Sequence, residues 1–202
     1  SATNQTPRET TCGGPIEEHV LRLELKLIAD IGLVGMPNAG KSTLLSAISA
    51  ARPKVADYPF TTLQPHLGIA ELDLDRRLIV ADIPGLIAGA ADGAGLGHRF
   101  LKHIERTGAL LHLVDVMPVD GSDPVSNYNA IRDELEKYSK ELAAKDEIVV
   151  LNKVDLLPPN ERDETLATIA KELQLNPVIA CSGATREGVR DVLGHCWDLT
   201  GK

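Results

Sequence analysis

The fold of this chain is decided by eight residues, Gly35-Met36-Pro37-Asn38-Ala39-Gly40-Lys41-Ser42, which match the pattern G-x-x-x-x-G-K-[ST]. The apolar residues 28–34 before them predict a buried strand, and residues 43–50 after them carry apolar side chains at helical spacing. Glycines let the backbone N–H groups of such a loop point inward, and the helix start adds the positive end of its dipole. The stretch therefore predicts a cradle for phosphate groups, with Lys41 reaching the β- and γ-phosphates and Ser42 ligating Mg²⁺.

The composition is that of an ordinary globular chain with an acidic balance. Its 202 residues are enough for one α/β domain with an additional segment, and no apolar run approaches the length of a membrane span. The net charge of −8 argues against a nucleic-acid-binding surface on the chain itself. The three cysteines form no C-x-x-C pattern and the six histidines form no ligand set, so we expect neither a disulfide framework nor a zinc site, but a reducing compartment.

The rest of the sequence predicts strands and helices in alternation. We expect strands at residues 67–72, 78–81, 110–115, 148–151 and 177–180, and helices at residues 100–106, 127–143, 161–173 and 187–199. The first two of these strands are close enough to form a hairpin, residues 51–64 are expected to form a loop, and residues 20–27 a strand or an extended lead-in. Repeated strand–helix units predict an α/β fold, a mostly parallel sheet with one antiparallel hairpin strand and helices on both faces. Its ligands are expected at the carboxyl ends of the strands.

Two further segments supply groups that a magnesium–phosphate site needs. Asp82 follows a predicted strand and is placed to hold Mg²⁺ through a water molecule, and Gly85 leaves its N–H free to approach a γ-phosphate. Thr62 offers a hydroxyl to Mg²⁺ and a backbone N–H to the γ-phosphate, and Thr61 is the second candidate. The glycine-dense residues 85–97 predict a switch that becomes ordered only with ligand, and a plain surface loop is the alternative.

The pattern Asn152-Lys153-x-Asp155 predicts recognition of guanine. The Asp155 carboxylate accepts hydrogen bonds from N1–H and the 2-amino group of guanine, whereas adenine presents an acceptor at N1 and has no 2-amino group. An unsatisfied carboxylate costs about 1–3 kcal/mol or more, which disfavours ATP. We expect the stem of Lys153 to lie against the base, Asn152 to brace the loop, and backbone N–H groups of Cys181-Ser182-Gly183-Ala184 to face the guanine carbonyl oxygen.

At this point the chain resembles the P-loop GTPases with a Ras-like fold, and more narrowly the Obg family. The resemblance covers about residues 20–200 and rests on the stretches Leu23-Glu24-Leu25-Lys26-Leu27-Ile28-Ala29-Asp30, Gly35 to Ser42, Ala56-Asp57-Tyr58-Pro59-Phe60-Thr61-Thr62-Leu63, Asp82-Ile83-Pro84-Gly85-Leu86-Ile87, and Gly95-Leu96-Gly97-His98-Arg99-Phe100-Leu101-Lys102-His103-Ile104-Glu105-Arg106-Thr107. Family members usually carry Ser-Ala where this chain has Ser182-Gly183, so we expect the geometry of the base loop to depart from the family's.

The resemblance implies how the chain is divided and what it acts with. Residues 29–200 are expected to form the GTPase domain, and residues 1–28 are expected to be the last segment of the glycine-rich domain that precedes it in the family. The family acts in assembly of the large ribosomal subunit and in stress signalling. Because most of the glycine-rich domain is missing and the chain is acidic, we expect this chain alone to bind the ribosome poorly. We also expect a cytoplasmic monomer that makes no contact with a membrane.

The expected ligands are GTP and GDP with Mg²⁺. Nucleotide contacts are expected from Gly35, Met36, Pro37, Asn38, Ala39, Gly40, Lys41, Ser42, Thr43, Phe60, Thr61, Thr62, Asp82, Ile83, Pro84, Gly85, Asn152, Lys153, Asp155, Ser182, Gly183 and Ala184. Metal ligation is expected from Ser42, Thr62 and Asp82, and catalytic roles are expected from Lys41, Thr62, Gly85 and Asn38.

Three hypotheses describe the activity: a slow GTP hydrolase that acts as a switch, a GTP-dependent binding module with negligible turnover, and an ATPase. Leu86 motivates the second, because Ras-like proteins carry a water-orienting glutamine at this position. Hydrolysis without that glutamine needs positive charge, from a partner's arginine, from Arg52 or Arg99, or from K⁺. The amide oxygen of Asn38 is a candidate K⁺ ligand, by analogy with similar potassium-dependent GTPases, and the alternative is a turn residue chosen for backbone geometry.

Overall fold

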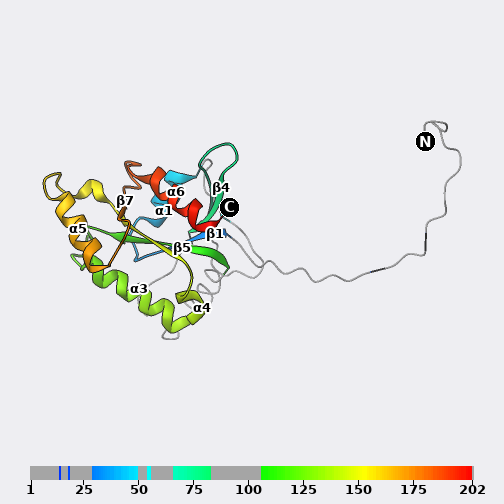
Figure 1. Ribbon diagram of the computed structural model, residues 1–202, viewed down its shortest axis with the longest axis horizontal. Helices are drawn as coiled ribbons and strands as arrows, with labels where there is room; N and C mark the ends of the chain where they lie inside the picture. The colour runs from blue at the N-terminus through cyan, green and yellow to red at the C-terminus, as the bar shows by residue number, and fades with distance from the viewer. Residues whose placement is uncertain are drawn as a thin grey trace.

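The computed structural model describes Gly14, Glu18 and residues 29–49, 54–55, 66–82 and 106–201. Within these residues seven strands form one sheet in the order β2-β3-β4-β1-β5-β6-β7 (Figure 1). The strands are β1 Ala29–Val34, β2 Lys54–Val55, β3 His66–Glu71, β4 Arg77–Asp82, β5 Thr107–Asp115, β6 Glu147–Asn152 and β7 Ile179–Cys181. The helices are α1 Lys41–Ile48, α3 Pro124–Tyr138, α4 Lys140–Ala143, α5 Arg162–Glu172 and α6 Val189–Thr200, with a short 3-10 helix, η2, at Val154–Leu156.

The pairing of the strands confirms the predicted α/β fold. β1 lies parallel to β4 and β5, and β5, β6 and β7 continue in parallel. β3 pairs antiparallel with both β4 and β2, so it is the strand that runs against the others. Lys54–Val55 forms β2 within residues 51–64, which we interpreted as a loop; two residues are too few to produce a readable alternation, and only pairing with β3 makes them a strand.

Helices cover both faces of the sheet because side chains of successive strand residues point to opposite sides. Leu111 and Leu113 of β5 pack in the core cluster that contains residues of α1 and α6. Leu110 of the same strand packs with residues of α3 and α4, and Val114 packs with Ile169 of α5. Figure 1 shows α1 and α6 on one side of the sheet and α3, α4 and α5 on the other. This three-layer arrangement leaves the carboxyl ends of the parallel strands free for the loops that carry the motifs.

The segment 127–143, expected as one helix, is two helices. Ser139 has an extended backbone with φ −156° and ψ 125°, so α3 ends at Tyr138 and α4 begins at Lys140. Its N–H donates to the carbonyl of Leu135, and its hydroxyl accepts a hydrogen bond from the N–H of Leu142, so one serine caps both helices. α3 also begins earlier than expected, at Pro124, because the side chain of Asp123 caps it.

Other helices and strands begin or end a few residues from the positions expected from the sequence. β5 begins at residue 107 rather than 110, β7 covers residues 179–181 rather than 177–180, and α6 begins at residue 189 rather than 187. The expected lead-in at residues 20–27 and residues 100–105 of the expected helix 100–106 lie outside the described residues. Among the described helices, none has both the length and the apolar character needed to cross a membrane.

Candidate functional site

The predicted phosphate loop lies between the end of β1 and the start of α1. Gly35 and Gly40 have φ angles of 145° and 97°, which favour glycine. A Cβ on Gly35 would meet the carbonyl oxygen of Leu113 in the neighbouring strand, and a Cβ on Gly40 would collide with the side-chain amide of Asn152. The two glycines of the motif are therefore required by close approach of the loop to β5 and β6, and by their backbone conformation.

Lys41 is bound within the phosphate loop. Its Nζ donates hydrogen bonds to the carbonyl oxygens of Gly35 at 2.9 Å and Met36 at 3.0 Å. Burial lowers the pKa of Lys41, and the negative charge of Asp82 opposes this effect. The ammonium is thus held at the centre of the loop, where an anionic ligand would meet a desolvated positive charge.

Ser42 and Asp82 place two side-chain oxygen atoms that could ligate a metal beside the phosphate loop. The Ser42 hydroxyl donates to Asp82 Oδ2 at 2.5 Å. Asp82, at the end of β4, is 2% exposed, and its other oxygen, Oδ1, has no hydrogen-bond partner among the residues that the structure describes. A hydroxyl and a carboxylate are oxygen ligands of the kind that Mg²⁺ prefers, and a cation would supply the partner that the described residues do not give Asp82 Oδ1. The residues present therefore fit Mg²⁺.

The residues expected to recognise the base gather around one cavity of about 170 Å³. The cavity is lined by Gly40, Thr43, Asn152, Lys153, Asp155, Leu156, Ser182, Gly183 and Ala184. These residues come from the phosphate loop, the start of α1, the loop after β6 and the loop after β7, which are far apart in the sequence. The sheet brings them together because β1, β6 and β7 end at the same edge.

Asn152 joins the loop after β7 to the phosphate loop. Its Nδ2 donates to the carbonyl oxygen of Ala39 at 2.7 Å, and its Oδ1 accepts from the N–H of Gly183 at 3.1 Å. The Cys181 thiol lies 3.4 Å from the same Oδ1, and burial raises the pKa of this thiol to about 12, so it stays protonated and donates. Asn152 is 1% exposed, so these partners are not replaced by water. Asn152 thus connects residues of two loops that are far apart in the sequence.

The loop after β7 is closed on itself. The N–H of Ser182 donates to the carbonyl of Glu187, and the Ser182 hydroxyl accepts from the N–H of Thr185 at 3.0 Å. Glu187 also binds Arg162 at the start of α5, with 2.6 Å between Nη2 and Oε1. An alanine Cβ at Gly183 would lie 3.2 Å from the backbone nitrogen of Leu44, so glycine lets this loop lie closer to α1 than alanine would allow without a small shift.

The structure brings most of the predicted site residues together. Lys41, Ser42 and Asp82 meet at the phosphate loop, and the residues expected to contact the base line the cavity described above. Met36, Pro37 and Asn38 line a neighbouring cavity of about 330 Å³. The remaining predicted residues lie outside the described ones: Phe60, Thr61, Thr62, Ile83, Pro84 and Gly85.

Two contacts beside the 170 Å³ cavity were not predicted from the sequence. Asp115 accepts a hydrogen bond from Lys153 Nζ, and Cys181 donates to Asn152. Asp115 is the last residue of β5, as Asp82 is of β4, so its position at a carboxyl strand end is the pattern that predicts it. Asn38 is exposed and has a φ of 64°, a backbone conformation in which asparagine is common among non-glycine residues.

The fold and the site define a nucleoside-triphosphate-binding P-loop protein. A family model described as "50S ribosome-binding GTPase" matches residues 30–153. The chain belongs to this family, and it is a GTP-binding domain that hydrolyses GTP.

Solved structures with the same fold are consistent with this family. The G domain of the T. maritima FeoB iron transporter is 19% identical, with a TM-score of 0.61, and the match covers 85% of this chain and 98% of that one. A variant of Aquifex aeolicus Era bound to GDP and AlF4− is 21% identical, with a TM-score of 0.60, and the match covers 85% of this chain and 56% of that one. Era in complex with MgGDPNP and part of 16S ribosomal RNA is 20% identical, with a TM-score of 0.60 and coverages of 87% and 57%. The chain therefore spans little more than half the length of the Era structures, and at these identities the likeness concerns the fold.

Proposed function

We propose that this chain is a slow, Mg²⁺-dependent GTP switch of the Obg type, with guanine bound in the 170 Å³ cavity. The single observation that supports the proposal most is the convergence of Asp155, Lys153 and the loop after β7 on that cavity, directly beside Gly40 of the phosphate loop. A nucleotide is continuous from base to phosphates, so a base cavity and a phosphate loop must adjoin as these do.

In this proposal the phosphate side is held by Lys41, Ser42 and Asp82. Ser42 and Asp82 are the described residues that would hold Mg²⁺, and Thr62 and Gly85 are proposed to join them from segments outside the described residues. Mg²⁺ held by these residues would supply positive charge against the phosphates during phosphoryl transfer. K⁺ is a further proposed cofactor, with Asn38 as its ligand.

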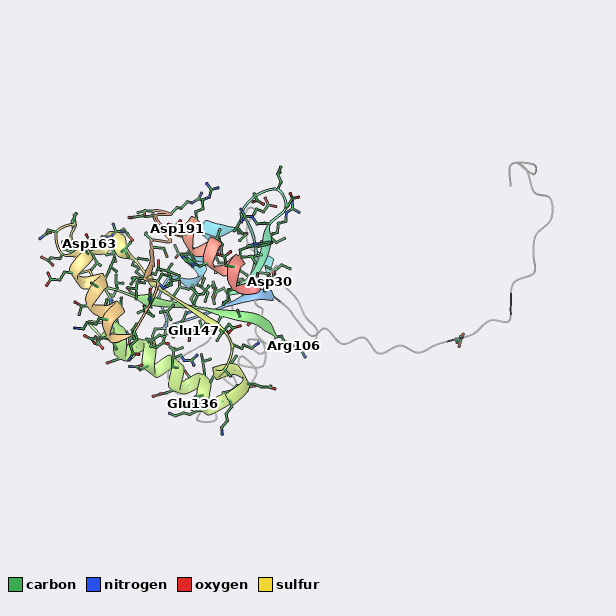
Figure 2. The ribbon with its side chains drawn as sticks, in the orientation of Figure 1. Asp30, Arg106, Glu136, Glu147, Asp163 and Asp191 are labelled. Atoms are coloured by element: carbon green, nitrogen blue, oxygen red, sulfur yellow. The ribbon has the colours of Figure 1, made fainter. Side chains whose placement is uncertain are left out.

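Replacement of Asp155 tests the assignment of the base site. Asp155→Asn presents an amide donor to N1–H of guanine, so we expect GTP and GDP to bind about 5- to 150-fold more weakly, which corresponds to about 1–3 kcal/mol, and xanthosine triphosphate to bind more tightly. The measurement is the dissociation constant of each nucleotide. Asp163→Asn is the matched control, because Asp163 lies in the first turn of α5 on the outside of the domain (Figure 2) and lines no part of the cavity.

Single-turnover hydrolysis of GTP and ATP then separates a hydrolase from the alternatives. We expect hydrolysis of GTP and little of ATP in the unchanged chain. Tight GTP binding without turnover would favour the GTP-dependent binding module, and unchanged GTP affinity in Asp155→Asn would remove Asp155 from base recognition.

The role in assembly of the large ribosomal subunit is proposed from the resemblance to Obg and from the description of the matching family. The Era structure with part of 16S ribosomal RNA is consistent with a ribosomal partner for a fold of this type. Co-sedimentation with isolated large subunits, with GDP or a non-hydrolysable GTP analogue, tests it. GTP-dependent association supports the role, and no difference between the two nucleotides argues against it.

A further inference from the structure

The charged end of Lys153 is held away from the base cavity by Asp115. The distance between Lys153 Nζ and Asp115 Oδ2 is 2.5 Å, in an ion pair whose side chains are 21% and 9% exposed. The other carboxylate oxygen, Oδ1, accepts a hydrogen bond from the backbone N–H of Met117 at 3.0 Å. Both oxygens of Asp115 are therefore occupied, so the carboxylate has a defined orientation and offers Lys153 a fixed partner.

The backbone sets the direction of the lysine. Asp115 is the last residue of β5 and lies opposite Asn152, the last residue of β6, in the parallel register. Lys153 follows directly with a φ of 69°, a left-handed conformation that turns the chain out of β6 into η2. The ion pair thus connects the ends of two adjacent strands, at the point where the loop after β6 begins.

Lys153 lies at the boundary between two cavities. It lines the 170 Å³ cavity that also contains Asp155, whereas Asp115 lines the 330 Å³ cavity beside residues 36–38 of the phosphate loop. With its ammonium bound to Asp115, Lys153 presents its aliphatic stem to the base cavity, where a flat aromatic ring needs an apolar wall. Without Asp115 the ammonium is free to turn toward the phosphates, and ordering its long side chain on binding would weaken the nucleotide complex.

We propose that Asp115 is a positioning residue for guanine-nucleotide binding, which acts by holding Lys153 extended along the base cavity. The inference rests on the proposed function, because it requires that the cavity bind the base. Asp115 itself contacts no part of the nucleotide in this proposal. A purely structural ion pair between the two loops is the competing explanation, and the experiment below distinguishes them.

The test uses isosteric variants. Asp115→Asn keeps the shape of the side chain and an acceptor for the Met117 N–H but removes the charge that holds Lys153, and Lys153→Met keeps the stem and removes the ammonium. We expect GDP to bind about tenfold more weakly to Asp115→Asn, mainly through faster dissociation. In the Lys153→Met background, Asp115→Asn should weaken GDP no further, because its effect passes through the lysine. Asp120→Asn is the matched control, since this exposed carboxylate on the same loop binds Ser122 rather than Lys153, and GDP affinity should not change.

Binding of a second ligand distinguishes a role in positioning Lys153 from a general effect on folding. Inorganic triphosphate contacts the phosphate loop but has no base, so its affinity should be equal in the unchanged chain and in Asp115→Asn. The proposal is overturned if Asp115→Asn keeps full GDP affinity, if the losses of the two single variants multiply in the double variant, or if triphosphate weakens as much as GDP. Failure of the proposed function looks different: Asp155→Asn would then leave GDP affinity unchanged.

Discussion

Asn152 is the residue whose loss should disturb both halves of the site at once. Its side chain is 1% exposed and connects the carbonyl of Ala39 in the phosphate loop with the N–H of Gly183 in the loop after β7. Asn152→Ala removes both hydrogen bonds and leaves two buried backbone groups without partners. We therefore expect a loss of stability as well as a loss of nucleotide affinity.

The magnitude follows from the two bonds. Each intramolecular hydrogen bond contributes about 0.5–1.5 kcal/mol net, and each buried group left unpaired costs about 1–3 kcal/mol. Ala39 and Gly183 are both buried, so the two unpaired groups together cost about 2–6 kcal/mol. Relaxation of the loops or entry of water brings the loss toward the lower part of this range. We expect the free energy of unfolding to fall by roughly 2–4 kcal/mol. This is a large share of the roughly 5–15 kcal/mol that stabilises a typical domain.

Urea unfolding of the nucleotide-free chain measures this loss directly. The matched control is Asn160→Ala, an asparagine on an exposed turn, which should change the free energy of unfolding by less than about 0.5 kcal/mol. If Asn152→Ala also changes it by less than about 0.5 kcal/mol, the two hydrogen bonds do not hold the loops together. In that case, the account of Asn152 as the connection between the loop after β7 and the phosphate loop is refuted.

Two further predictions concern pH and the cation. Burial lowers the pKa of His112 below its usual 6.5, and Glu147, whose carboxylate lies 2.7 Å from His112 Nδ1, opposes this shift. Arg132 forms an ion pair with Glu147, and the ring of Tyr128 stacks on His112. The unfolded chain then binds the proton more tightly, so stability is full above about pH 6.5 and falls with decreasing pH by up to about 1.4 kcal/mol per unit. His112→Gln should flatten this slope in urea unfolding, and an unchanged slope would assign it to other groups. Separately, GTP hydrolysis should be faster in KCl than in NaCl at equal ionic strength, and Asn38→Ala should abolish the difference. Equal rates in the two salts would instead favour an arginine from a partner as the source of positive charge.

The motifs themselves were determined by the sequence, because their chemistry depends on short spacing. Residues 35–42 follow a buried strand and precede a helix, as the pattern requires, and the hairpin of β3 and β4 was predictable from two apolar segments with a short turn. The order of strands and helices also predicted that the motif residues meet at one edge of the sheet. Local backbone geometry and the alternation of side chains decide all of these features, so a short stretch of sequence is enough to predict each of them.

The contacts that organise the site were decided only by the tertiary structure. Asn152 and Ala39 are 113 residues apart, and Lys153 and Asp115 are 38 apart, so neither partnership has a local pattern. The same holds for β2, which is a strand only because β3 lies beside it, and for Ser139, whose capping bonds to both neighbouring helices divide a segment with continuous helical periodicity. Which partner a polar side chain finds depends on the strand order and register of the sheet, and those follow from packing of the whole core rather than from neighbouring residues.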